Sequence, residues 1–81
     1  MSRHATAEAE RRGIDPGLID AVLQNPDQVV PAFGGKVAYQ SRLAEQGRDY
    51  LLRVVVSESS TTAVVVTVYK TSRVAKYWRK S

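Results

Sequence analysis

Residues 50–71 read YLLRVVVSESSTTAVVVTVYKT, and this stretch decides the fold. It contains two runs rich in β-branched and aromatic residues, 50–56 and 63–71, separated by a polar segment at 57–61. Such a pattern is typical of two strands joined by a turn. The first run is apolar except for Arg53, so we expect a central strand there.

Alternation along the second run divides it into two faces. Val64, Val66 and Val68 share one face, which we expect to pack against helices. The other face carries Val65, Thr67, Tyr69 and Thr71. On the first run, Arg53 interrupts a face formed by Leu51 and Val55, so a hairpin would bring Arg53 near Thr67 or Tyr69. The sequence therefore predicts a polar site on an otherwise closed sheet.

Two short helices are predicted before the strands. Ser2 is suited to cap a helix over 3–12 that ends at Gly13. Asp15-Pro16 starts a second helix, because proline at the first helical position gives up only an unpaired N–H. Asn25-Pro26 stops that helix. Two helices joined by one tight turn indicate a helical hairpin.

The remaining proline and glycine residues mark strand ends and turns that complete an α+β fold. Pro31 places a short strand over 29–33 at a sheet edge, and Gly34-Gly35 is a strong hairpin turn. Another strand runs from Val37 to about Gln46-Gly47, and a basic helix is expected over 72–80. The prediction is one domain over 1–81: a helical hairpin, an antiparallel sheet of about four strands and a C-terminal helix.

Composition excludes several classes of protein. The 81 residues suffice for one small core, and the absence of cysteine removes disulfides and cysteine-ligated metal centres. A single histidine, His4, provides no histidine pair for a metal, so we expect no metal and no cofactor. No apolar run reaches the ~18 residues of a membrane span. No signal-peptide core is found either, which predicts a soluble, cytoplasmic protein without membrane contact.

Charge is concentrated at the end of the chain. Five of the twelve cations fall in the last twelve residues with no acid among them, while the other 69 residues carry seven cations and eight acids. Such a patch favours phosphates or an acidic partner, although solubility and a helix C-terminus also explain it. The candidate RNA-binding residues are Lys70, Arg73, Lys76, Arg79 and Lys80.

The side chains present suit phosphodiester chemistry without a metal. RNA supplies its own nucleophile, the 2′-hydroxyl, so a protein needs only to orient it, stabilise charge on phosphorus and move a proton. Arginine binds phosphate through two parallel hydrogen bonds, and histidine or tyrosine can transfer protons. His4, Arg12 and Tyr69 also have structural explanations, namely capping, helix C-terminal contacts and core packing. Arg53 is harder to explain structurally, because a charge on a central strand needs a partner or an exposed site. The set is His4, Arg11, Arg12, Arg53, Thr67, Tyr69 and Lys76.

A resemblance extends over nearly the whole chain. The motifs are H-A at 4–5, R-G-I at 12–14, N-P at 25–26, and V-V-T-V-Y at 65–69 before Tyr77-Trp78. Together they resemble a bacterial family of small domains of unknown function that has been grouped with RelE-like and BrnT-like toxins. The resemblance implies a RelE- or barnase-like fold shared with metal-independent ribonucleases. It also implies a toxin–antitoxin operon whose acidic antitoxin covers the active face.

Residue by residue, the resemblance gives catalytic positions to His4, Arg12, Thr67 and Tyr69. One position departs from the family pattern, because an arginine usually follows the histidine by four residues and Glu8 stands there. His4 and Glu8 are expected to pair across one helical turn. A carboxylate repels phosphate where a guanidinium would bind it.

Two hypotheses follow, and whether the protein is an enzyme stays open. The first is a toxin-like, metal-independent ribonuclease in which Arg53 and Arg12 bind phosphate, His4 or Tyr69 moves protons, and the basic last helix holds the RNA backbone. The second is a non-catalytic module that uses the same surface to bind RNA or an acidic protein. Neither hypothesis specifies an oligomeric state.

Overall fold

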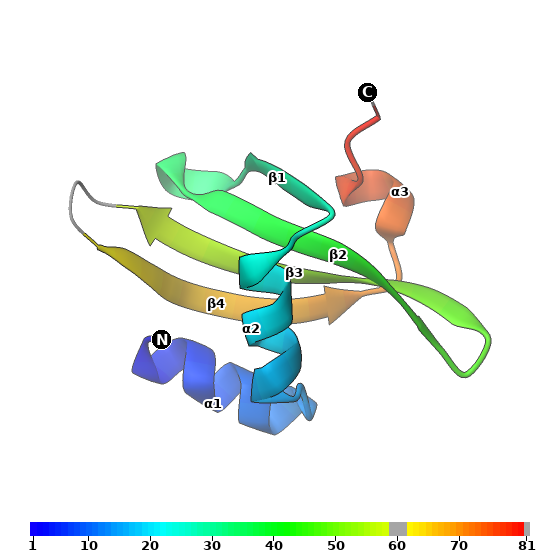
Figure 1. Ribbon diagram of the computed structural model, residues 1–81, viewed down its shortest axis with the longest axis horizontal. Coiled ribbons are helices and arrows are strands. Elements are labelled where there is room, and N and C mark those ends of the chain that lie inside the picture. The colour runs from blue at the N-terminus through cyan, green and yellow to red at the C-terminus, as the bar shows by residue number, and fades with distance from the viewer. Residues whose placement is uncertain (59–61, 81) are drawn as a thin grey trace.

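The centre of the structure is a four-stranded antiparallel sheet with strand order β1-β2-β3-β4 (Figure 1). The structure, a computed structural model, describes residues 1–58 and 62–80. The strands are β1 (Gln28–Pro31), β2 (Val37–Glu45), β3 (Arg48–Glu58) and β4 (Ala63–Thr71). The predicted α+β class, the edge position of β1 and the central position of β3 are confirmed.

Both N-terminal helices begin and end where their capping residues predict. In α1 (Arg3–Arg12), Ser2 Oγ accepts a hydrogen bond from the Ala5 N–H at 3.1 Å. Gly13 adopts φ 67°, which lets the N–H of Ile14 reach the Ala9 carbonyl. In α2 (Pro16–Gln24), the Asp15 carboxylate accepts from the Gly17 N–H at 2.8 Å.

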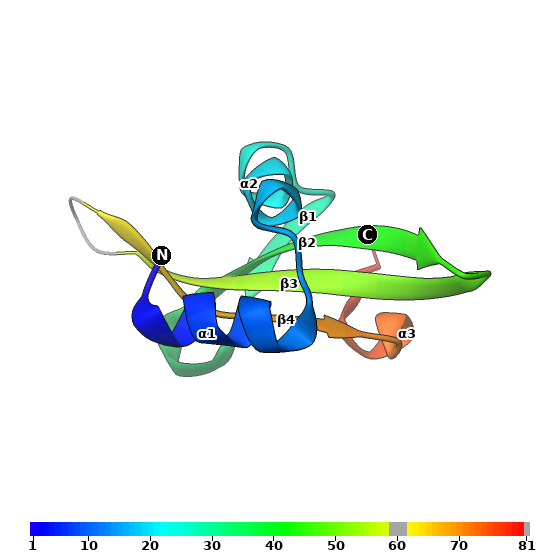
Figure 2. The same cartoon turned by 90° about the horizontal axis from the view of Figure 1, so that it is seen from below.

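The two helices contact different parts of the sheet. Helix α1 runs beside β4, and the Ser2 N–H donates to the Val65 carbonyl at 2.9 Å (Figures 1 and 2). Helix α2 crosses one face over β2 and β3. The two helices of the expected hairpin therefore lie against different parts of the sheet: α1 covers the outer edge of β4, and α2 covers one face.

The core has a large and a small cluster on opposite faces of the sheet. Beneath α2, Ile19 and Val22 pack with Leu52 and Val54. The opposite face, here called the open face, has a smaller cluster around Ala38 and Val55. Residues 51–56 are all buried because β3 is covered on both faces, which explains their nearly continuous apolar run.

A β-bulge changes which residues of β4 face the helices, so part of the predicted alternation is wrong. The register between β3 and β4 shifts between Val55 and Val56. As a result, Val65 joins the helix-covered core and Val66 packs on the open face. The extra residue of a bulge reverses the alternation on one side of it. The prediction was right from residue 67 onward and wrong for 64–66.

The C-terminal helix is shorter than predicted. Helix α3 (Val74–Tyr77) is a single turn on the open face, and Arg73 provides no side-chain cap (Figure 2). Two side-chain amides form hydrogen bonds with the backbone at the end of α3 and after it. Gln40 Nε2 donates to the Tyr77 carbonyl, and the Gln28 side chain bonds to the backbone of Arg79. These bonds favour an extended chain after Tyr77 over a longer helix.

The other connections match their predictions where they are described. Gly34 and Gly35 have φ of 62° and 73° in the one-turn helix η1 (Phe33–Gly35) between β1 and β2. Gln46 and Gly47, also with positive φ, connect β2 to β3. Of the turn expected at 57–61, residues 57 and 58 continue β3, and residues 59–61 lie outside the described residues.

Packing of α2 on the sheet predicts an asymmetry between two identical substitutions. Val22→Thr places a hydroxyl at a site that is 3% exposed and should lower the free energy of unfolding. We expect ~1–3 kcal/mol. Val29→Thr makes the same change at a site that is 48% exposed and should have little effect. Urea unfolding followed by circular dichroism measures both, and equal midpoints would contradict this packing.

Candidate functional site

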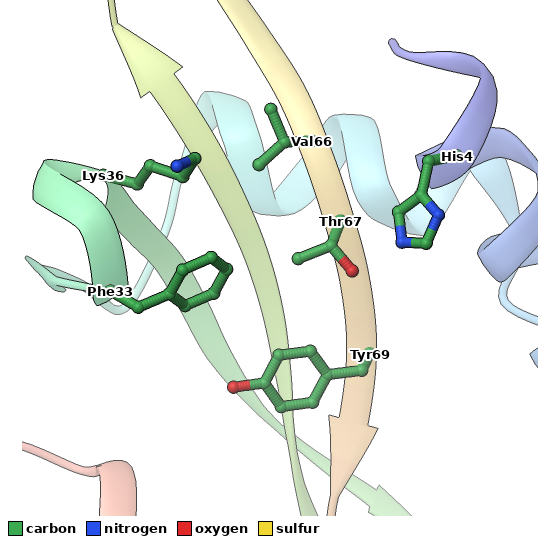
Figure 3. A pocket seen from close by; sticks show the side chains of 6 residues that line it. All are labelled: His4, Phe33, Lys36, Val66, Thr67 and Tyr69. Atoms are coloured by element: carbon green, nitrogen blue, oxygen red, sulfur yellow. The ribbon is translucent and has the colours of Figure 1, made fainter.

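The open face contains a hollow of about 400 Å³ beside β4 (Figure 3). Its volume falls within the ~300–1,000 Å³ of small-molecule sites. Polar groups from three separate elements converge on it. The lining residues are His4, Phe33, Lys36, Val66, Thr67 and Tyr69.

Each wall of the hollow is positioned by local structure. His4 lies in the first turn of α1, which the Ser2–Val65 hydrogen bond ties to β4. Thr67 and Tyr69 share the open face of β4, because residues two apart on a strand point the same way. Phe33 and Lys36 come from the η1 turn, where the Ala32 N–H donates to the Lys36 carbonyl at 2.8 Å.

The chemistry of the hollow combines a titratable ring, an ammonium and a hydroxyl. Figure 3 shows Phe33 and Lys36 on one side and His4 on the other, with Thr67 and Tyr69 between them. The His4 side chain is 66% exposed, so solutes can reach its imidazole. Lys36 Nζ lies 5.3 Å from the centre of the Phe33 ring. This arrangement suits a ligand with both a negative charge and an apolar part.

Arg53 lies beneath the wall of this hollow. It is 7% exposed, its Nε donates to Gln40 Oε1 at 2.9 Å, and its Nη1 donates to the Tyr69 hydroxyl at 2.5 Å. The Tyr77 ring covers the guanidinium, with its centre 4.2 Å from Cζ. Within residues 1–58 and 62–80, Arg53 forms no ion pair with a carboxylate. A buried positive charge is thus held by neutral partners.

Two glutamine amides extend this network to the end of the chain. Gln40, fully buried, donates to Gln28 Oε1 at 2.9 Å and to the Tyr77 carbonyl at 3.1 Å. Gln28 in turn donates to the Arg79 carbonyl at 2.5 Å and accepts from the Arg79 N–H at 2.9 Å. Hydrogen bonds from these side-chain amides therefore hold the end of the chain over Arg53.

The hydroxyl of Tyr69 stays protonated at neutral pH. Burial raises the pKa of this phenol above its usual value of 10.0, while the hydrogen bond from Arg53 opposes the increase. A hydrogen bond with the Tyr77 side chain also raises this pKa, so the Tyr69 hydroxyl is held between Arg53 and Tyr77.

Glu8 pairs with the two arginines at the end of α1 and also lies near His4, one of the lining residues of the hollow. Its carboxylate forms ion pairs with Arg12 at 2.8 Å and with Arg11, and it lies 3.8 Å from His4 Nε2. The Arg12 guanidinium, followed by that of Arg11, lowers the pKa of Glu8. The predicted pairing of His4 with Glu8 is present, and Arg12 does not line the hollow.

The C-terminal cations do not form one helical face. Lys70 pairs with Glu45 at 2.9 Å, and only Lys76 lies within α3. Lys80 lines a second hollow, where Arg42 stacks on Trp78 with Cζ 5.1 Å from the ring centre. Arg73 precedes α3 and Arg79 follows it. Their role in RNA binding stays a prediction.

Sequence reasoning brought together His4, Thr67 and Tyr69, with Arg53 behind them, but missed other members of the site. Phe33 and Lys36 were hidden because Gly34-Gly35 indicates only a turn and not what its flanking side chains reach. Gln40 had a detectable signal: it lies opposite Arg53 in the strand register, so the two share a face. The catalytic roles of His4, Arg12, Arg53, Thr67 and Tyr69 stay predictions.

Neither a membrane span nor a metal cluster is found in the described part of the chain. None of its helices has the length and apolar character to cross a bilayer. No group of three or more metal-ligating side chains occurs within 1–58 and 62–80.

The amide network predicts a large effect from one buried glutamine. Gln40→Ala leaves the Nε–H donor of Arg53 without its partner and should lower the free energy of unfolding by ~1–3 kcal/mol or more. Gln24→Ala, on the exposed end of α2, is the matched control and should have little effect. Chemical denaturation compares them, and a Gln40→Ala midpoint equal to wild type would refute this role.

The ion pairs of Glu8 predict acid sensitivity. Because its pKa is lowered on folding, the stabilisation is present above the ordinary value of 4.5 and is lost as the pH falls through the folded value. Glu8→Gln should reduce stability at pH 7 and flatten its loss between pH 5 and pH 2. Glu10→Gln removes an exposed carboxylate of the same helix and should keep the wild-type profile. Urea midpoints across this range provide the measurement.

The comparisons with known proteins bear on the family. The family described as "Domain of unknown function (DUF4258)" matches residues 1–70. No curated protein and no solved structure matches the chain. The match supports the expected small domain of unknown function, whereas a relation to RelE-like and BrnT-like toxins stays a prediction. The chain belongs to the DUF4258 family.

Proposed function

We propose that the hollow binds RNA and cleaves it by attack of the 2′-hydroxyl on the adjacent phosphate, without a metal. The observation that carries the proposal is the convergence of His4 and Lys36, from α1 and the η1 turn, on one hollow of the open face. An accessible imidazole provides proton transfer near neutral pH, and an ammonium attracts phosphate.

The proposed reaction needs few groups. Neutral His4 accepts the proton of the 2′-hydroxyl, the 2′ oxygen bonds to phosphorus, and the bond from phosphorus to the 5′ oxygen breaks. The leaving oxygen takes a proton from solvent, and the products are a 2′,3′-cyclic phosphate and a free 5′-hydroxyl. Lys36 stabilises the negative charge that develops on the phosphate oxygens. Thr67 offers a hydroxyl that orients the phosphate.

Arg53 and Tyr69 have a supporting role in this proposal. Arg53 does not line the hollow, but its charge lies behind Tyr69, whose ring forms one wall. In a poorly solvated position this charge adds positive potential at the hollow. Tyr69, fixed by Arg53, presents a rigid wall and a protonated hydroxyl.

The proposal includes a toxin–antitoxin setting. The net charge of +4 favours an acidic protein partner as well as RNA. A partner seated on the open face would cover the hollow and block cleavage. The Lys76, Arg79 and Lys80 cations, near the chain end, would hold further RNA backbone or the same partner.

The alternative, a non-catalytic binding module, is favoured by Glu8. This carboxylate holds Arg11 and Arg12, so the hollow has fewer cations than a site for two phosphates would use. In that case the hollow binds RNA or an acidic protein without cleaving it.

Cleavage of a fluorescent single-stranded RNA by purified protein, in the presence of EDTA, tests the proposal. His4→Ala should slow cleavage by ~10²–10⁴-fold, because it removes the proton acceptor. Arg3→Ala, an exposed neighbour on α1, is the matched control and should retain activity. The same strand with 2′-deoxyribose should stay intact. Binding of RNA without cleavage would favour the alternative, and cleavage unaffected by His4→Ala would sink the proposal.

A further inference from the structure

Phe33 has an unusual position among the aromatic side chains. The chain has six aromatic residues, all within the described part, and the other five are at least partly buried. Phe33 is 63% exposed and is not part of either core cluster. Its ring therefore contributes little to the stability of the fold, yet it lines the hollow (Figure 3).

The backbone turn that carries the ring is closed by its own hydrogen bonds. Gly34 and Gly35 adopt positive φ, a conformation that other residues rarely adopt, and the turn is closed by the Lys36 N–H donating to the Phe33 carbonyl at 3.1 Å. Binding to a ring on a closed turn requires little ordering of the backbone, which favours affinity.

The groups around Phe33 select the chemistry of the ligand. The ammonium of Lys36 lies 5.3 Å from the ring centre, the Val66 side chain adds an apolar wall, and Thr67 adds a hydroxyl. A matching ligand has a flat apolar face, polar edges and a negative charge within a few ångströms. A nucleotide has all three, and stacking of a base on an aromatic ring tolerates any base.

We propose that Phe33 is a stacking platform for one unpaired nucleobase, with the phosphate of that nucleotide at Lys36. This inference deepens the proposed function and rests on it for the choice of RNA as ligand. A base within a duplex is stacked on both sides and shows only its edges in the grooves. The site therefore selects single-stranded RNA over double-stranded RNA.

A non-cleavable probe tests the inference separately from catalysis. The probe is a 2′-O-methyl hexanucleotide with 2-aminopurine at one internal position, whose fluorescence decreases when the base stacks on an aromatic ring. Wild-type protein should bind and quench it, and the same strand annealed to its complement should bind at least tenfold more weakly. The variant Phe33→Leu keeps an apolar side chain but removes the aromatic face. It should abolish the quenching and weaken binding by about 5- to 150-fold.

Two controls make the result specific to the aromatic face. Phe33→Trp should restore quenching and affinity, because indole stacks as well. Val29→Leu changes an exposed residue of β1 that does not line the hollow, and it should behave as wild type. Since Phe33 is exposed, all of these variants should fold, which circular dichroism checks.

The outcomes separate this inference from the proposed function. Quenching that depends on Phe33, with no cleavage of unmodified RNA, supports the stacking site and overturns catalysis. Binding and quenching that are the same in wild type and Phe33→Leu overturn the stacking site, even where cleavage occurs. Absence of binding to the single strand also overturns it.

Discussion

The buried guanidinium of Arg53 is the constraint on which the open face depends. A charge removed from water needs favourable partners. Here Gln40 and Tyr69 accept hydrogen bonds from the guanidinium, and the Tyr77 ring covers it in a cation–π contact. These partners belong to β2, β4 and α3, so satisfying one side chain joins three elements. The same bonds fix the Tyr69 ring as a wall of the hollow and fasten the chain end through Gln28. The same hydrogen-bond network thus stabilises the fold and shapes the candidate site, so a substitution in the network should affect both.

A second constraint is the position of α1 beside β4. Antiparallel sheets expose two edges, and this one covers the edge of β4 with a helix while Pro31 interrupts the edge of β1. Small residues make close packing possible, because Ala5 and Ala9 are buried against the sheet. Covering the edge also brings the first turn of α1 to the open face. His4 reaches the hollow for this reason, and the N-terminal cap at Ser2 contributes to function as well as to stability.

Much of the fold was predictable from local patterns. Ser2, Gly13, Asp15 and Pro16 placed both helices correctly, since capping depends on residues within one turn. The apolar run at 50–56 identified the central strand, and the strand register brought Arg53 opposite Tyr69 as expected. The bulge near Val56 and the early end of α3 were missed. Both depend on hydrogen bonds between distant segments, which leave no periodic signal in the chain.

The sequence by itself determined the element order, the helix caps and the pairing of the β3 face that carries Arg53 with the β4 face that carries Thr67 and Tyr69. It did so because each of these features depends on neighbours along the chain or on strict alternation. Only the tertiary structure decided that Phe33 and Lys36 share a hollow with His4. It also decided that the chain end folds over Arg53. The Gln28–Arg79 hydrogen bonds join residues 51 positions apart. Contacts at that distance depend on the packing of the whole sheet, and no local pattern encodes them.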